Sequence, residues 1–162
     1  MNKVYLLIGG NIGDRLANLN TAIDCIEKLC GKMLKASAIY ETEAWGFKDQ
    51  AAFLNQALLI ETELGAAQLM QTLLDIEKQL GRIRINPLGP RTIDIDIIYF
   101  NDEIVETEIV SIPHPRLVER NFVLMPLVEI APDYIHPVFN KTNALLLKEC
   151  GDSSAVYKKT TF

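Results

Sequence analysis

The N-terminal part of the chain carries a strand pattern followed by a helix pattern. Residues 4–8 form a short apolar run that ends at glycines, as expected for a buried strand. Asp14 is then well placed as a helix N-cap. The apolar residues that follow recur three and four positions apart: Leu16, Leu19, Ile23, Ile26 and Cys30. Gly31 is predicted to end this helix, and residues 33–40 are predicted to form a second strand.

The same succession of strand and helix appears a second time. Between residues 53 and 61 the side chains alternate, and one face consists of Phe53, Asn55, Ala57, Leu59 and Glu61. A second helix is indicated by apolar residues at helical spacing: Ala66, Leu69, Leu73, Ile76 and Leu80. Gly81 is predicted to end it, and residues 93–100 are predicted to form a fourth strand. Residues 101–102 predict a turn into a short partner strand near residues 104–105.

Two consecutive β-α-β units predict an α+β protein. The expected architecture is a ferredoxin-like βαββαβ sandwich, in which helices pack on a mostly antiparallel sheet. The connections 41–52 and 82–92 are long and irregular, which is typical of functional loops. Further helical turns are predicted at 122–130 and 143–150. No boundary or low-complexity tract interrupts the pattern, so we expect one domain over residues 1–162.

Charge and cysteine content narrow the classes of function. The formal net charge is −5, which disfavours a general nucleic-acid-binding protein. A small anionic ligand remains possible because arginines gather locally: Arg82, Arg84 and Arg91 in one group, Arg116 and Arg120 in another. The three scattered cysteines match no disulfide framework or metal motif, and we expect reduced thiols. With no signal peptide and no membrane-spanning stretch, the expected location is the cytoplasm.

The segment GPRTIDIDI at 89–97 is the strongest local signal of chemistry. In a strand, Asp94 and Asp96 project from the same face about 7 Å apart, while the isoleucines face the core. Asp is depleted in strands, and two adjacent carboxylates suit Mg²⁺ that also binds substrate phosphates. The alternative is a solvated polar face. Arg82 and Arg91 near this pair favour phosphoryl transfer, although each arginine alone could be a surface charge.

Two further segments invite a ligand-binding interpretation. In IPHPR, prolines on both sides restrict the backbone at His114, and the following Arg116 and Arg120 favour contact with an anion over a structural histidine. The glycine-rich segment 9–13 fits neither the dinucleotide-binding fingerprint, which needs Gly where Asn11 stands, nor a P-loop. A tight turn is the better interpretation of these glycines.

From Tyr5 to about Pro132 the chain resembles the 6-hydroxymethyl-7,8-dihydropterin pyrophosphokinase family of folate biosynthesis. The motifs that carry this resemblance are IGGNIGDR, FLNQALLIET, LLDIEKQLGRIR, GPRTIDIDIIYF and IPHPRLVERNFVLMPLVEIAP. In this order, GPRTIDIDI and the IPHPRL to RNFVL stretch are highly specific. The resemblance implies transfer of diphosphate from ATP to the pterin hydroxymethyl group, with release of AMP.

The resemblance also implies roles for individual residues. Two Mg²⁺ ions would be bound by Asp94 and Asp96, and Arg82 and Arg91 would be catalytic loop residues. The pterin would be bound by Phe53, Asn55, Phe122, Thr42 and Trp45, with the two phenylalanines stacking on the ring. Without the resemblance, these two phenylalanines would be read as core residues. The ATP site would contain Glu77, Arg84, Ile97, Ser111, His114 and Arg120.

The chain departs from the family pattern at a few positions. Leu88 stands where Trp is common, Ile85 where a basic residue is common, and the segment 83–88 is slightly short. We expect weaker closure of this loop over ATP, with the metal site unaffected. Gly10 replaces a Ser that is usual in the family.

The expected partners are ATP and 6-hydroxymethyl-7,8-dihydropterin, with no nucleic acid, no membrane and a monomeric protein. One alternative is a non-catalytic ferredoxin-like module that binds a small ligand or RNA, which Mg²⁺-dependent ATP binding would separate from the enzyme. Another is a different phosphotransferase on the same scaffold, which would release ADP and not AMP.

Overall fold

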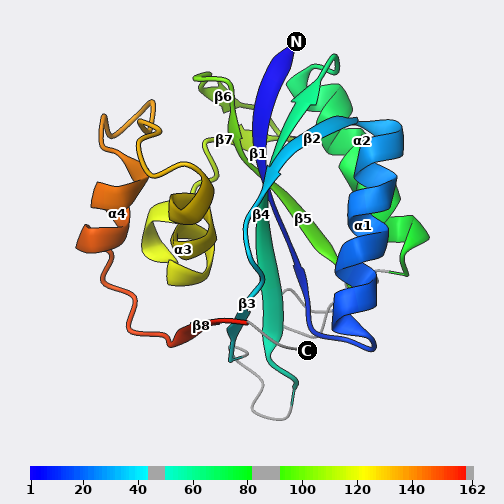
Figure 1. The fold of residues 1–162 in the computed structure, drawn as a ribbon. Coiled ribbons are helices and arrows are strands. Elements are labelled where there is room, and N and C mark those ends of the chain that lie inside the picture. The colour runs from blue at the N-terminus through cyan, green and yellow to red at the C-terminus, as the bar shows by residue number, and fades with distance from the viewer. Residues whose placement is uncertain (44–49, 82–91, 160–162) are drawn as a thin grey trace.

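The computed structural model describes residues 1–43, 50–81 and 92–159 (Figure 1). The first half of the element order is β1 (Asn2–Gly10), α1 (Arg15–Leu29), β2 (Gly31–Ala36), β3 (Tyr40–Thr42), β4 (Phe53–Thr62) and α2 (Ala66–Gln79). The second half is β5 (Asp94–Phe100), β6 (Val105–Glu106), β7 (Ser111–Ile112), η1 (Leu117–Glu119), α3 (Asn121–Ile130), α4 (Asn143–Glu149) and β8 (Val156–Lys158). The helix and strand patterns of the sequence therefore form the expected βαββαβ succession.

The main sheet has the strand order β5-β1-β4-β3-β8, and β2 also pairs with β4. Every pair in it is antiparallel. Each β-α-β unit crosses over one strand, so that β1 and β4 lie in the centre and the strands that follow the helices lie outside them. This arrangement confirms the predicted ferredoxin-like α+β fold.

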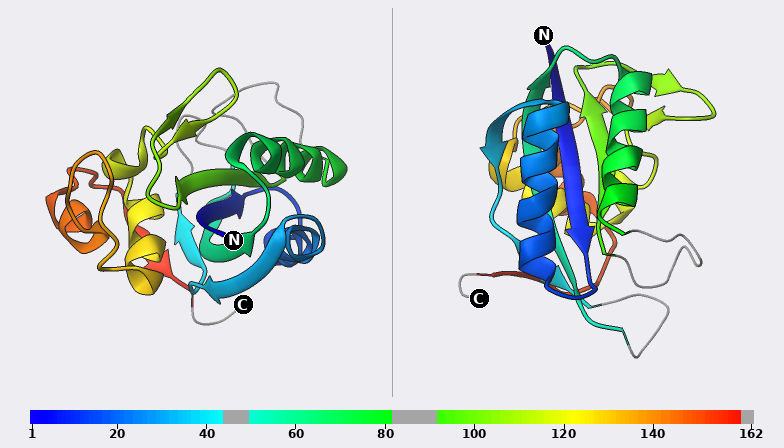
Figure 2. Two further views of the ribbon diagram at one scale, coloured as in Figure 1. Left: turned by 90° about the horizontal axis from the view of Figure 1, so that it is seen from above. Right: turned by 90° about the vertical axis from the view of Figure 1, so that its right-hand side faces the viewer.

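Helices cover both faces of this sheet. The helices α1 and α2 pack on one face (Figure 2, right), and α3 and α4 lie on the other (Figure 1). Strand alternation divides the apolar side chains accordingly. The first core lies under α1 and α2 and includes Val4, Leu6, Ile8, Leu58, Ile95 and Ile97. The second lies under α3 and α4 and includes Leu7, Ala57, Tyr99, Val123, Leu124 and Leu127.

Two of the three predicted helix boundaries have the expected geometry. The Asp14 side chain accepts a hydrogen bond from the backbone N–H of Ala17 at 3.0 Å, so Asp14 is the N-cap of α1. Gly81 follows α2 with a φ of +86°, a conformation that favours glycine. Gly31 acts differently, because it begins β2, and a Cβ there would lie 2.0 Å from the Glu61 carbonyl oxygen. Close strand approach is what requires glycine at this position.

The single strand predicted at 33–40 is wrong in its boundaries. The structure has two strands, β2 and β3, separated at residues 37–39. At the break, the Ser37 backbone N–H donates to the Ala57 carbonyl at 2.9 Å, and the Ser37 hydroxyl accepts from the Ala57 N–H at 2.9 Å. A side chain thus replaces part of the backbone ladder, which periodicity alone does not reveal.

The C-terminal half contains two further differences from the prediction. The short strand near residues 104–105 is β6, but it pairs with β7 in a separate two-stranded sheet and not with β5. The strand β8 was not predicted because it is only three residues long and lies among polar residues. It pairs with β3 and places the C-terminal segment beside Tyr40–Thr42. The predicted helical turns after residue 121 are confirmed as α3 and α4.

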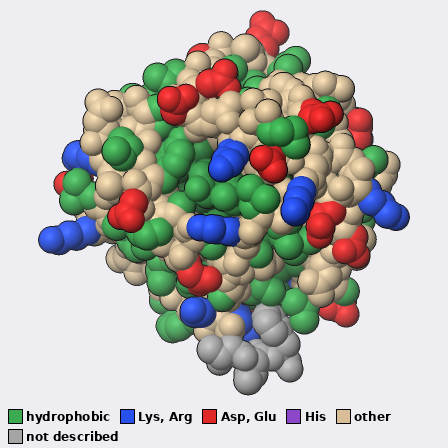
Figure 3. Space-filling view, turned by 45° about the horizontal axis from the view of Figure 1, so that its top comes forward, with side chains coloured by type: hydrophobic (Ala, Val, Ile, Leu, Met, Phe, Trp, Pro, Cys, Tyr) green, Lys and Arg blue, Asp and Glu red, His purple; other side chains and the backbone are tan. Residues whose placement is uncertain are grey.

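The surface charges, the cysteines and the helices can be compared with the expectations from composition. Figure 3 shows basic and acidic side chains interspersed around a central hydrophobic area on the face that it presents, rather than one continuous basic surface among the residues visible there. Cys25, Cys30 and Cys150 are free thiols. None of the helices in the described ranges has the length and apolar character that crossing a membrane requires.

Candidate active site

Four residues from four neighbouring strands form one row across the sheet. Gly9 of β1 lies directly opposite Asn55 of β4 on one side and Asp94 of β5 on the other. Tyr40 of β3 continues the row as the partner of Asn55. Residues opposite each other in antiparallel strands share a face, so this row lies on the face covered by α3. It brings together residues that are far apart in the sequence.

The two aspartates share the same face, as predicted. Asp94 and Asp96 are partly exposed, and Ile95 and Ile97 between and beyond them are buried in the core under α1 and α2. Asp96 lies opposite Leu7, one row further into the sheet than Asp94. In the described part of the chain no group of three or more metal-binding side chains forms. Two carboxylate oxygens from one strand still fit Mg²⁺, which keeps waters and takes phosphate oxygens as further ligands.

Glu77 supports the outer edge of the strand that carries the aspartates. Its side chain is 2% exposed, and its Oε2 accepts a hydrogen bond from the Ile95 N–H at 2.7 Å. Among the described residues β5 is an edge strand that pairs with β1, so this contact satisfies a backbone N–H on the side away from β1. A buried carboxylate from α2 thus helps to hold the backbone between Asp94 and Asp96.

The tight-turn interpretation is wrong for Gly9 and Gly10. Both lie within β1, and of the three glycines in the segment only Gly13 has a positive φ, of +68°. A Cβ on Gly9 would lie 2.2 Å from the Asn55 Oδ1 atom and 2.8 Å from the Leu54 carbonyl oxygen. The space of the missing side chain is therefore filled by the carboxamide of Asn55. In the sequence, a glycine that continues a strand pattern is the feature that could have indicated such a close approach of a neighbouring side chain.

Four of the residues expected around the pterin come from β3, β4 and α3. Thr42 lies opposite Phe53, next to the Asn55 row and on the same face. Thr42 is 3% exposed, and its Oγ1 has no hydrogen-bond partner among the described residues. A buried hydroxyl without a partner is costly in a folded protein, and a polar ligand edge would satisfy it. Asn55 is likewise 6% exposed.

Phe122 occupies the first turn of α3, the helix that packs on β4 and β3. Its ring is partly buried against the second core, and the guanidinium carbon of Arg120 lies 5.5 Å from the ring centroid. This distance fits a cation–π contact. The structure thus places Phe122 and Phe53 on the same side of the sheet, from elements distant in the sequence.

His114 lies beside β5, at the start of the segment that carries Arg116 and Arg120. Its backbone N–H donates to the Ile98 carbonyl at 3.0 Å, and its Nδ1 accepts from the Arg116 N–H at 3.2 Å. Burial lowers the pKa of His114 to about 4; nearby Arg120 and Arg116 act in the same direction and Asp94 opposes them. The imidazole is therefore neutral at pH 7, and with Nδ1 accepting, Nε2 carries the proton and can donate.

Comparison with known proteins decides the family. Residues 5–132 match the family model of 7,8-dihydro-6-hydroxymethylpterin-pyrophosphokinase (HPPK). The chain belongs to the HPPK family. It is 41% identical over 141 residues to the 2-amino-4-hydroxy-6-hydroxymethyldihydropteridine pyrophosphokinase of Aquifex aeolicus, covering 87% of this chain and 88% of that protein. The Bacillus subtilis protein of the same name is 46% identical over 130 residues, covering 80% and 78%.

Longer proteins contain an HPPK-like region of the same kind. The folic acid synthesis protein fol1 of Schizosaccharomyces pombe is 43% identical over 138 residues, covering 84% of this chain and 19% of that protein. The fold resembles the Plasmodium falciparum HPPK-DHPS crystal structure with pterin and p-hydroxybenzoate, with a TM-score of 0.71, 20% identity, and 91% of this chain but 41% of that chain covered. The chain thus spans a minor part of these longer proteins and most of the two bacterial ones.

The structure brings most of the described HPPK site residues together, but not all of them. Asp94, Asp96, Asn55, Phe53 and Thr42 come together on one face, with Phe122, Arg120 and His114 on the segments covering that side. Ile97 does not join them through its side chain, which is 2% exposed in the opposite core, so only its backbone could contact a ligand. The Ser111 hydroxyl hydrogen-bonds Glu106 Oε2 at 3.0 Å. Arg82, Arg84, Arg91 and Trp45, like the departures Ile85 and Leu88, lie outside the described residues.

We expect the metal-free protein to lose stability as the pH falls from about 6.5 toward 4. His114 and His136 are the chain's two histidines, and burial lowers the pKa of each below the ordinary value of 6.5. In this pH range the histidines of the unfolded chain therefore bind protons, whereas those of the folded protein stay neutral. Denaturant unfolding at pH 7, 6 and 5 should show the decrease, with a shallower slope for His114→Gln. An unchanged slope in this variant would contradict the lowered pKa of His114.

Proposed function

We propose that this chain transfers diphosphate from ATP to the hydroxymethyl group of 6-hydroxymethyl-7,8-dihydropterin, releasing AMP, as a step of folate biosynthesis. Family membership supports this reaction. The structural observation that carries it is the row Asn55–Gly9–Asp94. It sets the backbones of Asn55 and Asp94 about 10 Å apart, a distance of two strand spacings, so that an amide suited to a pterin edge and a carboxylate suited to metal-bound phosphate lie on one face.

On the pterin side, the residues offer both stacking and hydrogen bonding. Phe53 and Phe122 would stack on the two faces of the ring, and Asn55 would pair with its amide-like edge. The Thr42 Oγ1, which has no hydrogen-bond partner in the described ranges, would gain one from the bound ring. Glycine at position 9 leaves room for the Asn55 carboxamide over β1, which would hold this amide in place for the pterin edge.

On the ATP side, Asp94 and Asp96 would hold Mg²⁺, and two ions are proposed. When bound, Mg²⁺ would neutralise and orient the phosphate oxygens. His114 would donate one hydrogen bond from Nε2 to a phosphate oxygen, and Arg120 would add positive charge beside it. Glu77 would act indirectly, by holding the β5 backbone between the two carboxylates.

The reaction itself requires positioning more than acid–base chemistry. The hydroxymethyl oxygen attacks the β-phosphorus of ATP, and the bond from this phosphorus to the oxygen bridging to the α-phosphate breaks. AMP leaves with that oxygen, and the hydroxyl proton passes to solvent. No strong general base stands out among the described residues of the site, so orientation and electrostatic stabilisation carry the rate. Arg82 and Arg91 remain proposed catalytic arginines.

A product assay tests the proposal. The protein is incubated with ATP, Mg²⁺ and 6-hydroxymethyl-7,8-dihydropterin, and the nucleotides and pterins are separated by chromatography. We expect equal amounts of AMP and pterin diphosphate, and no product after chelation with EDTA. ADP as the nucleotide product would indicate a different phosphotransferase, and ATP turnover without pterin modification would also reject the proposal.

Phe122→Ala is expected to weaken pterin binding by about 1–3 kcal/mol, the range measured for base–aromatic stacking. Isothermal titration with pterin and, separately, with a non-hydrolysable Mg²⁺–ATP analogue measures the effect. The affinity for the nucleotide should barely change, because Phe122 is assigned to the pterin alone. Equal losses for both ligands would instead indicate damage to the second core, on which the ring packs.

Three broader features belong to the same proposal. Residues 1–162 form one domain, the protein works as a monomer, and its location is the cytoplasm. The continuous element order supports the first, and the free thiols suit a reducing compartment. Light scattering coupled to size-exclusion chromatography tests the monomer, and a stable dimer at micromolar concentration would reject it.

A further inference from the structure

We propose that Glu129 is a positioning residue of the pterin site, which holds α3 and its Phe122 at a set spacing from strands β3 and β4. The inference rests on the proposed function, because it concerns the same site. Glu129 lies seven residues after Phe122 in α3, two turns along the same side of the helix. It therefore acts at a distance from the ligand, through the placement of the helix.

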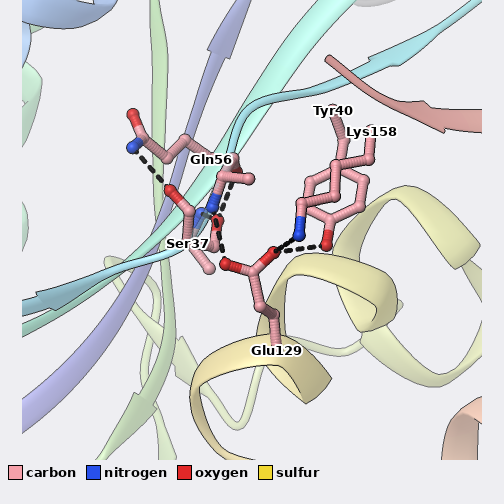
Figure 4. A network of polar contacts seen from close by, with 7 residues as sticks. Ser37, Tyr40, Gln56, Glu129 and Lys158 are labelled. Atoms are coloured by element: carbon pink, nitrogen blue, oxygen red, sulfur yellow. Dashed lines mark hydrogen bonds and ion pairs between the residues drawn. The ribbon is translucent and has the colours of Figure 1, made fainter. Parts of the chain in front are cut away.

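The Glu129 carboxylate joins three segments of the chain (Figure 4). Its Oε2 accepts a hydrogen bond from the Ala38 N–H at 2.8 Å, within the break between β2 and β3. Its Oε1 accepts from the Tyr40 hydroxyl at 2.6 Å, and the Lys158 Nζ of β8 lies 3.5 Å away. One side chain of α3 thus ties the helix to the strand that carries Thr42.

The segment that Glu129 holds is itself anchored to β4. Ser37, the residue before Ala38, exchanges two hydrogen bonds with the backbone of Ala57. From the opposite face of β4, the Gln56 side-chain amide donates to the Ser37 carbonyl at 2.8 Å (Figure 4). The chain of contacts Glu129–Ala38–Ser37–β4 therefore links α3 rigidly to the strand of Phe53 and Asn55.

Register connects this clamp to the predicted ligand residues. Tyr40 lies opposite Asn55, and Thr42, two residues further along β3, lies opposite Phe53. If Tyr40 shifted, Thr42 would shift with it, because both belong to the same three-residue strand. Because α3 carries Phe122 and β4 carries Phe53, the Glu129 clamp spans the two elements from which the stacking rings come.

The carboxylate is charged when it makes these contacts. Partial burial acts to raise the pKa of Glu129, but hydrogen bonds from Tyr40 and Ala38, with help from Lys158, lower it below the ordinary value. The two short hydrogen bonds to a charged acceptor carry most of the clamp. The Lys158 contact contributes little, because that side chain is 55% exposed and screened by solvent.

Spacing matters because a flat ring between two aromatic plates tolerates little error. Optimal contact on both faces needs about 7 Å between the plates, twice the best carbon–carbon distance, and contact energy falls steeply beyond it. A loosened clamp would therefore weaken pterin binding and misplace the hydroxymethyl group. The ATP side is set by β5, β1 and the segment around His114, whereas the hydrogen bonds and the ion pair given for Glu129 go to Ala38, Tyr40 and Lys158.

The test compares Glu129→Ala with Glu149→Ala in the full chain. Glu149 is a matched control, since it is also a glutamate at the end of a helix, but its ion pair is with Lys141 at 2.7 Å and not with a residue of β3. For each variant, Tm, the pterin Kd and the Kd of a non-hydrolysable Mg²⁺–ATP analogue are measured. Glu129→Ala should raise the pterin Kd about tenfold, the cost of losing hydrogen bonds to a charged group, and leave the nucleotide Kd within about twofold.

A second variant keeps the test decisive if Glu129→Ala fails to fold. Tyr40→Phe retains the ring and removes only one hydrogen bond, and we expect the pterin Kd to rise about threefold with little change for the nucleotide. A pterin Kd equal to wild type in these variants, or equal losses for both ligands, would overturn the inference. Failure of the wild-type protein to bind pterin would reject the proposed function itself, and is read from the same titrations.

Discussion

Asp96→Asn is expected to lower kcat by about three orders of magnitude while the protein remains folded. Asp96 shares its strand face with Asp94, and the two are the carboxylates assigned to Mg²⁺. The amide keeps the size of the side chain but removes the charge that binds the cation. Since the side chain is partly exposed, the loss of folding stability should be small. Steady-state kinetics over a range of Mg²⁺ concentrations, with Tm alongside, measures both effects.

The control for this prediction is Asp24→Asn, which removes the same charge from the exposed surface of α1. It should leave kcat and Tm near the wild-type values. The Mg²⁺ dependence is the more specific measurement, because a ligand variant should need more Mg²⁺ for its residual activity. If Asp96→Asn turns over at a near-normal rate with normal Mg²⁺ dependence, the two-carboxylate site is wrong.

Gly9→Ala is expected to abolish pterin binding at substrate concentrations that saturate the wild-type protein. The added methyl group would lie 2.2 Å from the Asn55 Oδ1 atom and 2.8 Å from the Leu54 carbonyl oxygen, so Asn55 must leave its place. Strain of this kind in a packed interior also costs about 1–3 kcal/mol of stability. Pterin titration and denaturant unfolding of the same variant separate the two effects.

Two further variants show whether the clash with Asn55 is the cause. Gly151→Ala adds the same methyl group where nothing lies within 4 Å, and should be neutral. In Gly9→Ala/Asn55→Ala the clashing carboxamide is absent, so part of the lost stability should return while pterin binding stays lost. The clash at Leu54 remains and limits the recovery. Normal pterin binding by Gly9→Ala alone would show that Asn55 does not require the space above this glycine.

The sequence by itself predicted the elements of the βαββαβ succession. Helical spacing after Asp14 and from Ala66 predicted α1 and α2, because a helix that packs on a sheet must repeat its apolar residues with the helical period. Alternation likewise predicted that Asp94 and Asp96 share one face of their strand and that Phe53 and Asn55 share one face of theirs. The ferredoxin-like fold followed from the tandem β-α-β pattern, and the motifs from Tyr5 to Pro132 indicated the HPPK family, which residues 5–132 confirm.

Only the tertiary structure decided how these faces meet. The register that sets Asn55 and Asp94 on either side of Gly9 depends on strand pairing between segments far apart in the chain, which periodicity within a segment does not contain. For the same reason Gly9 was assigned to a turn, although its role lies in the contact with Asn55. Glu129 carried no signal at all, because its partners Ala38 and Tyr40 become its neighbours only when α3 packs on the sheet. Local pattern therefore specifies which side a residue faces, whereas long-range pairing specifies what it faces.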